Sequence, residues 1–322
     1  MLKRMLTAAT AVALSLGLAS AVQAWEPKKP VEFVIMAGKG GGADKMARLM
    51  QTIIEKHGLS SKPFAPVNKP GGSGAEALIH MTKAKKGDDH TVMVTLNSFY
   101  TTPLRQPGLG VDIADFTPIG RMAEDTFLLW VNKDSGIEHI DQFVAKAKAA
   151  GKRWIMAGTG KGQEDQLLTH FLNKAYGLNM KYIPYKGGGR VAKELAGNHA
   201  HSTVNNPSEQ LGFYEAGKTR PLAAFTPERI DLFPDAPTFR ELGKDFVYFM
   251  QRSVVAPPGM SAAAAEYYRD VFRKVYDSEE WRSYMKKKAL RGDFMTGDDL
   301  KAYWKREKDI HENMLREIGE IR

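Results

Sequence analysis

The sequence predicts an α/β protein of two lobes, each built on a mainly parallel sheet flanked by helices. Short apolar runs that fit buried strands alternate with segments of helical periodicity over most of the chain. The alternation is interrupted by a long extended segment at residues 119–132 and then begins again, which indicates a second sheet of the same kind. The 322 residues are enough for two domains and a cleft between them.

The N-terminus has the pattern of a secretory signal peptide. Lys3 and Arg4 precede an apolar run at residues 5–21, and small residues end at Ala24, so cleavage is expected before Trp25. A membrane anchor is the less favoured alternative, because polar residues interrupt the run and a spanning helix needs about 20 apolar residues. The chain has no cysteine, and therefore neither a disulfide nor a lipid attached to cysteine. We expect a freely soluble protein of the bacterial periplasm.

The chain is basic. The formal net charge is +9 at pH 7, and loss of Lys3 and Arg4 with the signal peptide leaves about +7. Much of the excess lies in the last fifty residues, for example at residues 286–288, inside helical sequence with interleaved glutamates. A solvated helix surface is the favoured interpretation. No motif of stacked aromatic residues on a basic sheet is present, so no nucleic-acid partner is expected.

The first lobe begins with three strands, the first two of which lead into helices. A strand at 31–36 leads through a glycine-rich turn into a helix at 44–57, whose apolar residues have helical spacing. A strand at 62–68 is followed by a second helix at 75–84. The third strand, at 91–96, ends at Asn97 and Ser98.

The same rhythm resumes after the extended segment. The expected elements are a helix at 139–150, a strand at 154–157, a helix at 164–176, a strand at 181–184, a helix at 190–196, a strand at 201–204, a helix at 208–216 and a strand at 221–225. Residues 247–256 can return the chain to the first lobe, and residues 261–321 are mostly helical, with a capping-box pattern at Thr296 and Asp299. We therefore assign residues 25–124 and 250–322 to lobe 1 and residues 125–249 to lobe 2.

The glycine-rich turn after the first strand is the most informative feature. It consists of Gly38, Lys39, Gly40, Gly41, Gly42 and, one residue further, Asp44. Unpaired N–H groups and the helix dipole at such a turn favour a bound anion, here a carboxylate, and Asp44 either caps its own helix or meets the ligand through water. The turn also formally fits a dinucleotide fingerprint, but the second strand lacks the acid that would hold a ribose, and no phosphate-loop Gly-Lys-Ser/Thr follows. A third interpretation is that the glycines only permit a tight turn.

A second turn of this kind occurs in the second lobe. It consists of Gly158, Thr159, Gly160, Lys161, Gly162 and Gln163, followed by Glu164 and Asp165. Acids in a first helical turn interact well with the dipole, so we expect Glu164 and Asp165 to point away from the cleft. Other candidates for ligand binding lie where strands end, the edge at which open α/β folds bind ligands. They are Asn97, Ser98, Tyr185 and Asn205.

The sequence offers little for catalysis. It contains no G-x-S-x-G elbow, no H-E-x-x-H and no cysteine nucleophile. Its eight histidines lack the spacing of a metal site. We therefore expect no enzymatic activity, no cofactor and no metal.

Seven short motifs occur in a characteristic order. They are Gly40-Gly41-x-x-Asp44 with Ala47-Arg48, residues 67–74, Gly160-x-Gly162, Tyr185-Lys186-Gly187, residues 216–223, residues 235–243 and residues 256–259. Together they resemble the extracytoplasmic solute receptors of tripartite tricarboxylate transporters, the Bug family of periplasmic binding proteins. The resemblance extends over essentially the whole mature chain.

The resemblance implies a periplasmic-binding-protein fold, a Venus flytrap of type II, that closes over a di-, tri- or aromatic carboxylate. Backbone amides at residues 38–42 and 159–163 would hold the carboxylate, and membrane permease subunits would receive it from a monomeric receptor. The chain departs from the family at three positions. The family usually has serine or threonine at Gln163, histidine at Gln166, and proline or an aromatic residue at Lys39. The chain can therefore prefer a different carboxylate from the simple dicarboxylate binders. A sensor subunit for a signalling partner and an enzyme acting on a carboxylate or nucleotide remain alternatives.

Overall fold

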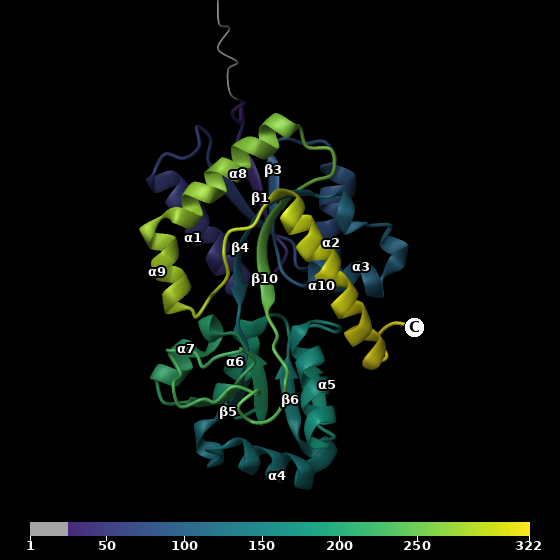
Figure 1. The fold of residues 1–322 in the computed structure, drawn as a ribbon, viewed down its shortest axis with the longest axis vertical. Helices are drawn as coiled ribbons and strands as arrows, with labels where there is room; N and C mark the ends of the chain where they lie inside the picture. The colour runs from purple at the N-terminus through teal and green to yellow at the C-terminus, as the bar shows by residue number, and fades with distance from the viewer. Residues whose placement is uncertain (1–24) are drawn as a thin grey trace, which may run out of the picture.

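The computed structural model describes residues 25–322, and the predicted signal peptide, residues 1–24, lies outside the described residues. Ten strands of the described chain form two separate five-stranded sheets. In Figure 1 one sheet lies in the upper half of the molecule and the other in the lower half. None of the helices in residues 25–322 is long and apolar enough to cross a bilayer.

The sheet of lobe 1 has the strand order β2–β1–β3–β10–β4. Its strands are β1 (Val31–Ile35), β2 (Phe64–Asn68), β3 (Thr91–Thr95), β4 (Thr117–Asp125) and β10 (Met250–Ala256). β1 pairs parallel with β2 and β3, whereas β10 is antiparallel to β3 and β4. A late segment of the chain therefore completes the centre of a sheet that the first 125 residues begin.

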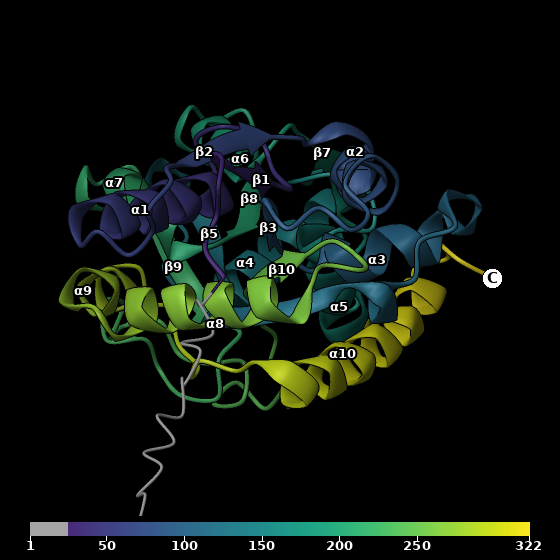
Figure 2. The same cartoon turned by 90° about the horizontal axis from the view of Figure 1, so that it is seen from above.

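Helices cover both faces of this sheet (Figure 2). On one face lie α1 (Gly42–Lys56), α8 (Ala262–Asp277) and α9 (Glu279–Lys287). On the other lie α2 (Ala75–Ile79), which continues as a π-helical turn (His80–Ala84), α3 (Ser98–Arg105) and α10 (Gly297–Glu317). The apolar stripe of α1, including Met46, Met50 and Ile53, is fully buried. Burial of each such side chain contributes about 1.5–3 kcal/mol.

The sheet of lobe 2 repeats this design with the order β7–β6–β8–β5–β9. Its strands are β5 (Leu128–Asn132), β6 (Ile155–Gly158), β7 (Lys181–Pro184), β8 (Ser202–Asn205) and β9 (Thr219–Ala224). β6 is parallel to β7 and β8, and β5 is antiparallel to β8 and β9. The flanking helices are α4 (Ile140–Ala150), α5 (Glu164–Tyr176), α6 (Gly188–Ala196) and α7 (Pro207–Glu215). The predicted two-lobed α/β class is confirmed, with mixed sheets.

The extended segment at residues 119–132 is not continuous. The chain leaves β4 at Asp125 and enters β5 at Leu128, so Thr126 and Phe127 mark the passage from one sheet to the other. Thr126 donates its hydroxyl hydrogen to the Ala289 carbonyl at 3.1 Å, and its own carbonyl accepts from the Asn206 amide at 2.7 Å. The Asn206 amide thus satisfies the Thr126 carbonyl, a group that a continuous strand would have paired within one sheet.

The predicted capping box at the start of α10 is wrong. Thr296 is the N-cap residue, but its hydroxyl donates to the Ile119 carbonyl at 2.6 Å and makes no bond to the first turn of the helix. A long-range contact to β4 therefore replaces the local one, which fixes the start of α10 on the sheet of lobe 1.

Candidate ligand-binding site

The two glycine-rich turns lie between the lobes, each against the opposite lobe. The Gly40 carbonyl oxygen is 3.6 Å from the point where a Cβ on Gly189, at the start of α6, would lie. A Cβ on Gly160 would lie 2.8 Å from the Ser73 hydroxyl of lobe 1. We call the region bounded by the two turns, Asn97 and the starts of α6 and α7 the inter-lobe site.

The first turn is stabilised by a hydrogen bond to the Asp44 carboxylate. Gly40 has a φ of +80°, which favours glycine, and its N–H donates to Asp44 Oδ2 at 2.9 Å. Asp44 Oδ1 accepts from Arg48 and Asn68, both at 3.0 Å. Burial acts to raise the pKa of Asp44, but the Gly40 N–H, Asn68 and Arg48 together hold it below its usual value. Asp44 thus bonds back to the turn that precedes its helix, which is closer to the predicted cap of the helix start than to a ligand contact through water.

The start of α1 points main-chain donors into the inter-lobe site. The first bond of the helix runs from the Lys45 N–H to the Gly41 carbonyl at 3.0 Å, so the N–H groups of Gly42 and Ala43 precede the helical ladder. A Cβ on Gly42 would lie 2.7 Å from Arg252 Nη2 and 3.3 Å from Ser208 Oγ. Only glycine fits where α1, β10 and α7 approach this closely. Gly38 is half-buried and Lys39 is exposed.

The second turn is also braced by side chains. The Thr159 N–H donates to Asp165 Oδ2 and the Gly162 N–H to Gln166 Oε1, both at 2.7 Å. Gly162 has a φ of +65°, and Gly158 is packed so closely that a Cβ would collide with Tyr182. Two of the main-chain donors predicted to hold a ligand are therefore occupied by side chains of α5.

The opposite lobe contacts this turn as well. Arg105 of α3 donates from Nη1 to the Lys161 carbonyl at 2.6 Å. Gln163 is the N-cap residue of α5, so the N–H groups of Glu164 and Asp165 precede its ladder. The turn is thus fixed from both lobes while the start of α5 keeps main-chain donors.

Glu164 faces the inter-lobe site, and the prediction that it points away is wrong. Its side chain is buried, and Oε1 accepts from the Asn97 N–H of lobe 1 at 3.1 Å. Asp165 turns back to Thr159 of its own lobe, as predicted. The difference arises because Asn97, at the start of α3, brings a free N–H to within reach of Glu164 and not of Asp165.

Asn97 connects the end of β3 to the strand that returns from lobe 2 and to α10. Its Oδ1 accepts from the Gln251 N–H at 3.0 Å, and its Nδ2 lies 3.1 Å from both Tyr248 Oη and His311 Nε2. The neighbouring Ser98 is fully buried, and its hydroxyl has no partner within residues 25–322.

His311 is neutral in this cluster. Its Nδ1 lies 2.7 Å from the Glu307 carbonyl, to which only an N–H can donate, so Nε2 is left to accept from the Tyr248 hydroxyl at 2.9 Å. Burial lowers the pKa of His311 to about 4.

Tyr185 and Asn205 lie at strand ends of lobe 2, as predicted. The Tyr185 N–H donates to the Gly158 carbonyl at 2.7 Å, and its ring packs against the small apolar cluster that contains Val191. Asn205 donates from Nδ2 to Glu209 Oε2 at 2.8 Å and accepts from Gln210 at 3.0 Å. Asn205 therefore positions Glu209.

Sequence reasoning missed three residues of the inter-lobe site, namely Asp125, Glu209 and Arg252. Arg252 donates to Asp125 Oδ2 from Nε at 3.0 Å and also from Nη2, and both side chains are almost completely buried. The polar triplet at residues 251–253, inside an otherwise apolar strand, could have drawn attention to Arg252. Asp125 and Glu209 have no comparable local pattern, because they join the site only through the tertiary fold.

The four acids of the site all have raised pKa values. Burial raises the pKa values of Asp125, Glu164, Asp165 and Glu209, and Arg252 only partly offsets this for Asp125, Glu164 and Glu209. For Asp165 the neighbouring Glu209 and Glu164 raise the pKa further. The site therefore combines main-chain donors with an excess of carboxyl groups.

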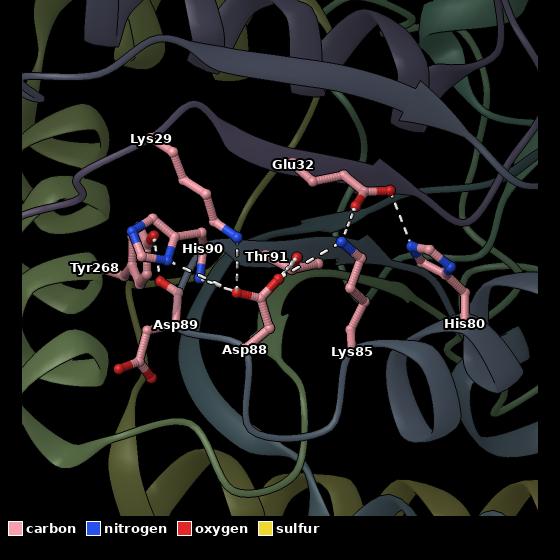
Figure 3. Close-up of polar contacts among 9 residues, drawn as sticks. All are labelled: Lys29, Glu32, His80, Lys85, Asp88, Asp89, His90, Thr91 and Tyr268. Carbon is pink, nitrogen blue, oxygen red and sulfur yellow. Dashed lines mark hydrogen bonds and ion pairs between the residues drawn. The ribbon is translucent and has the colours of Figure 1, made fainter.

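A second polar cluster lies at the opposite end of the lobe 1 strands (Figure 3). Glu32 contacts Lys85 at 2.7 Å and His80 at 2.9 Å, and Asp88 accepts from Thr91 at 2.8 Å. Although burial acts to raise it, Lys85 and His80 hold the pKa of Glu32 below its usual value. These charges neutralise one another, and they lie at the N-terminal ends of β1 and β3 rather than at the carboxyl ends, so the cluster is structural.

Two hollows lie outside the inter-lobe site. One of about 270 Å³ is lined by residues 226 and 228–232 of lobe 2, by residues 285, 286 and 289–291 at the end of α9 and just after it, and by Thr126. The other, about 450 Å³, lies beside α9. Neither is lined by a glycine-turn residue, and both open toward charged surface side chains such as Lys286.

Two sheets joined by crossing segments, with a glycine-rich helix start of each lobe lying against the other lobe, define the class of two-lobed binding proteins. The profile described as "Tripartite tricarboxylate transporter family receptor" matches residues 48–319. The chain belongs to this family. It is therefore a solute-binding receptor with the fold of the periplasmic binding proteins, and a receptor family implies binding rather than catalysis.

Individual relatives agree with this assignment. The UPF0065 protein in the gbd 5′ region of Cupriavidus necator is 26% identical over 292 residues, which cover 89% of this chain and 88% of that protein. The fold is similar to the structure of the periplasmic binding protein BugD, with a TM-score of 0.83, 21% identity and coverage of 91% of this chain and 98% of that one. It is also similar to R. palustris Rpa4515 with adipate, with a TM-score of 0.84, 24% identity and the same coverage.

Proposed function

We propose that this protein is an exported receptor of the periplasm that binds a small organic carboxylate in the inter-lobe site. It would then deliver the ligand, as a monomer, to the membrane permease subunits of a tripartite tricarboxylate-type transporter. The observation that supports this most directly is the pair of glycine-rich turns, which begin α1 and α5 in different lobes and each lie against the opposite lobe. The signal-peptide pattern at residues 1–24 supports export.

The start of α1 supports a carboxylate as the bound group. The N–H groups of Gly42 and Ala43 precede the helical ladder, and the helix dipole adds partial positive charge there. The Arg252 guanidinium lies directly behind Gly42. Hydrogen bonds from these donors to a carboxylate would be charge-assisted and therefore about twice as strong as neutral ones. The adipate held by the R. palustris protein is a carboxylate of the size proposed.

The proposed binding residues belong to four segments. They are Gly38, Lys39, Gly40, Gly41, Gly42 and Asp44 of the first turn, Asn97 and Ser98, Gly158, Thr159, Gly160, Lys161, Gly162 and Gln163 of the second turn, and Tyr185 with Asn205. Because Asp44, Thr159 and Gly162 are already bonded within the protein, we propose that they shape the turns. Ligand binding would favour the closed arrangement, because the donors come from both lobes.

Thermal-shift measurements on residues 25–322 test the proposal. The panel would contain succinate, adipate, citrate and benzoate, with glucose as an uncharged control. A true ligand raises the melting temperature further as its concentration rises, because a ligand at about 100 times its Kd adds about 2.7 kcal/mol to folding stability and the gain grows with the logarithm of the concentration. Equilibrium dialysis should return it chemically unchanged. If no carboxylate binds, or if the bound acid is converted, the proposal fails.

Gly41→Leu tests the first turn itself. Around the position of a Cβ on Gly41 only the Gly38 carbonyl lies within 4 Å, at 3.7 Å, so the substitution should leave the fold intact. A leucine side chain beside the start of α1 should nevertheless weaken binding at least tenfold. Gly212→Leu is the matched control, since nothing lies within 4 Å of that position in α7. Full affinity in Gly41→Leu would remove the first turn from the proposed site.

A further inference from the structure

The inter-lobe site contains more buried carboxyl groups than buried cationic side chains. Asp125 is paired with Arg252, but the ion pairs of residues 25–322 include none formed by Glu164, Asp165 or Glu209. Glu164 and Asp165 are 3% and 4% exposed. Buried carboxylates without a cation are costly, so this excess calls for a compensating group.

The lobe 2 acids are held in place by neutral donors. Glu164 accepts from the Asn97 N–H and Glu209 from the Asn205 amide. Both carboxylate oxygens of Glu209 lie 2.1 Å from the point where a Cβ on Gly188 would be. A side chain at the start of α6 would therefore collide with this carboxylate. The protein's own carboxylate thus takes a position that an anionic ligand group would otherwise use. Arg252 acts on both acids through space and Lys45 on Glu209, but within residues 25–322 neither acid accepts a hydrogen bond from a positively charged side chain.

Buried hydrogen-bonding groups without a partner lie beside the start of α1 and the Asp125–Arg252 pair. Ser208 is 8% exposed, and its Oγ has no partner within the described chain. This hydroxyl lies 3.3 Å from the same Cβ point on Gly42 from which Arg252 Nη2 is 2.7 Å away. Asp125 Oδ1 is likewise buried and unpartnered within residues 25–322. Unsatisfied polar atoms in a native interior indicate a missing partner, and here they gather where α1, α7 and β10 meet.

We propose that the inter-lobe site binds a carboxylate that also carries a protonated primary amine. The carboxylate lies at the start of α1 beside Arg252, and the ammonium group lies against Glu164 and Glu209. An ammonium group supplies three N–H donors and a full positive charge, which match the carboxylate oxygens that face it. The inference rests on the proposed function for the carboxylate end and adds the amine.

The experiment uses calorimetry on residues 25–322 at pH 7 with matched ligand pairs. Each pair differs only in the amine: succinate and aspartate, adipate and 2-aminoadipate. Malate controls for a neutral polar substituent, and 1,4-diaminobutane for charge without a carboxylate. We expect the amino member of at least one pair to bind tenfold or more tightly than its partner and than the hydroxy acid.

Variants assign the preference to residues. Glu164→Gln and Glu209→Gln keep an acceptor oxygen for Asn97 and Asn205 but remove the charge, so each should reduce the amine preference at least tenfold. Glu266→Gln, on the exposed side of α8, is the matched control and should leave it unchanged. Circular dichroism establishes that each variant is folded.

The outcomes separate this inference from the proposed function. Equal binding of amino and desamino acids, or an unchanged preference in both glutamine variants, overturns the amine and leaves the carboxylate receptor standing. Binding of 1,4-diaminobutane without any carboxylate overturns both. If no member of either pair binds, the inference is overturned, and the wider acid panel decides the proposed function.

Discussion

Arg252 and Asp125 illustrate how single residues shape this molecule. The two side chains form a buried ion pair between β10 and the end of β4, where the chain passes to lobe 2. Such a pair adds little stability over well-packed apolar residues, but loss of one partner typically costs 3–5 kcal/mol. We therefore infer that Asp125 serves mainly to position the Arg252 guanidinium behind Gly42.

His311 leads to a prediction about pH. Its pKa is about 4 in the folded protein, because burial lowers it, against about 6.5 in an unfolded chain. The unfolded state thus binds the proton more readily, so stability from this group is present above pH 6.5 and is lost as the pH falls from 6.5 toward 4. We expect a loss on the order of 2 kcal/mol between pH 7.5 and pH 4.5.

Urea unfolding of the protein and of His311→Asn checks this. The variant should have a shallower dependence of stability on pH over the same interval. His199→Asn, at an exposed position, is the control and should behave like the unaltered protein. Identical pH slopes in His311→Asn and the unaltered protein would contradict the assignment of a neutral, buried His311.

At the scale of elements, α10 links the lobes. Just beyond its end, Glu320 Oε1 accepts from Gln166 of α5 at 3.1 Å, and Oε2 accepts from Arg105 of α3 at 3.2 Å. Arg105 in turn donates to the Lys161 carbonyl of the second turn. The side chains of Arg105 and Glu320 are only 14% and 16% exposed, so their pair is less screened than a surface pair. These contacts hold the second glycine turn against lobe 1.

Glu320→Ala should therefore loosen the closed arrangement. It removes both contacts, and two partly buried hydrogen bonds of this kind are worth roughly 1–2 kcal/mol. We expect ligand affinity to fall about three- to tenfold, mostly through faster release measured by stopped-flow fluorescence, with little change in melting temperature. Glu312→Ala, which removes only a pair with Arg316 on the same helix, is the control. Unchanged release in Glu320→Ala would show that the contact does not stabilise closure.

At the scale of the whole molecule, the two sheets differ in whether their strands come from one continuous segment of the chain. All five strands of the second sheet come from one continuous segment, β5 to β9, whereas β4 pairs with β10, more than 120 residues later, and bridges to Arg291 and Met295, later still. We propose the boundaries 25–124 with 250–322 for lobe 1 and 125–249 for lobe 2 on this basis. Lobe 1 then needs residues 250–322 to complete its sheet, whereas lobe 2 has all its strands within residues 125–249.

Isolated fragments test these boundaries. Residues 125–249 should fold alone and melt cooperatively in circular dichroism, because every strand keeps its neighbours. Residues 25–124 should remain unfolded, because β3 and β4 both lose β10 and its apolar residues. A cooperative transition in the N-terminal fragment, or none in residues 125–249, would refute the division.

The sequence alone determined the elements of each lobe and the two glycine-rich turns. Those features depend on local patterns: apolar runs for buried strands such as β1 and β3, helical spacing in α1, and glycines at Gly40 and Gly162. The resemblance to a receptor family also came from short motifs in order. Local chemistry was sufficient for all of these.

Only the tertiary structure decided the electrostatic character of the site. Arg252, Asp125, Glu164 and Glu209 come from four elements and meet through long-range packing, which no local pattern encodes. It also decided that Glu164 faces the site and that Thr296 bonds to β4, because a partner from a distant segment replaced the local one. Side-chain direction at a helix start depends on which donors the rest of the chain brings within reach.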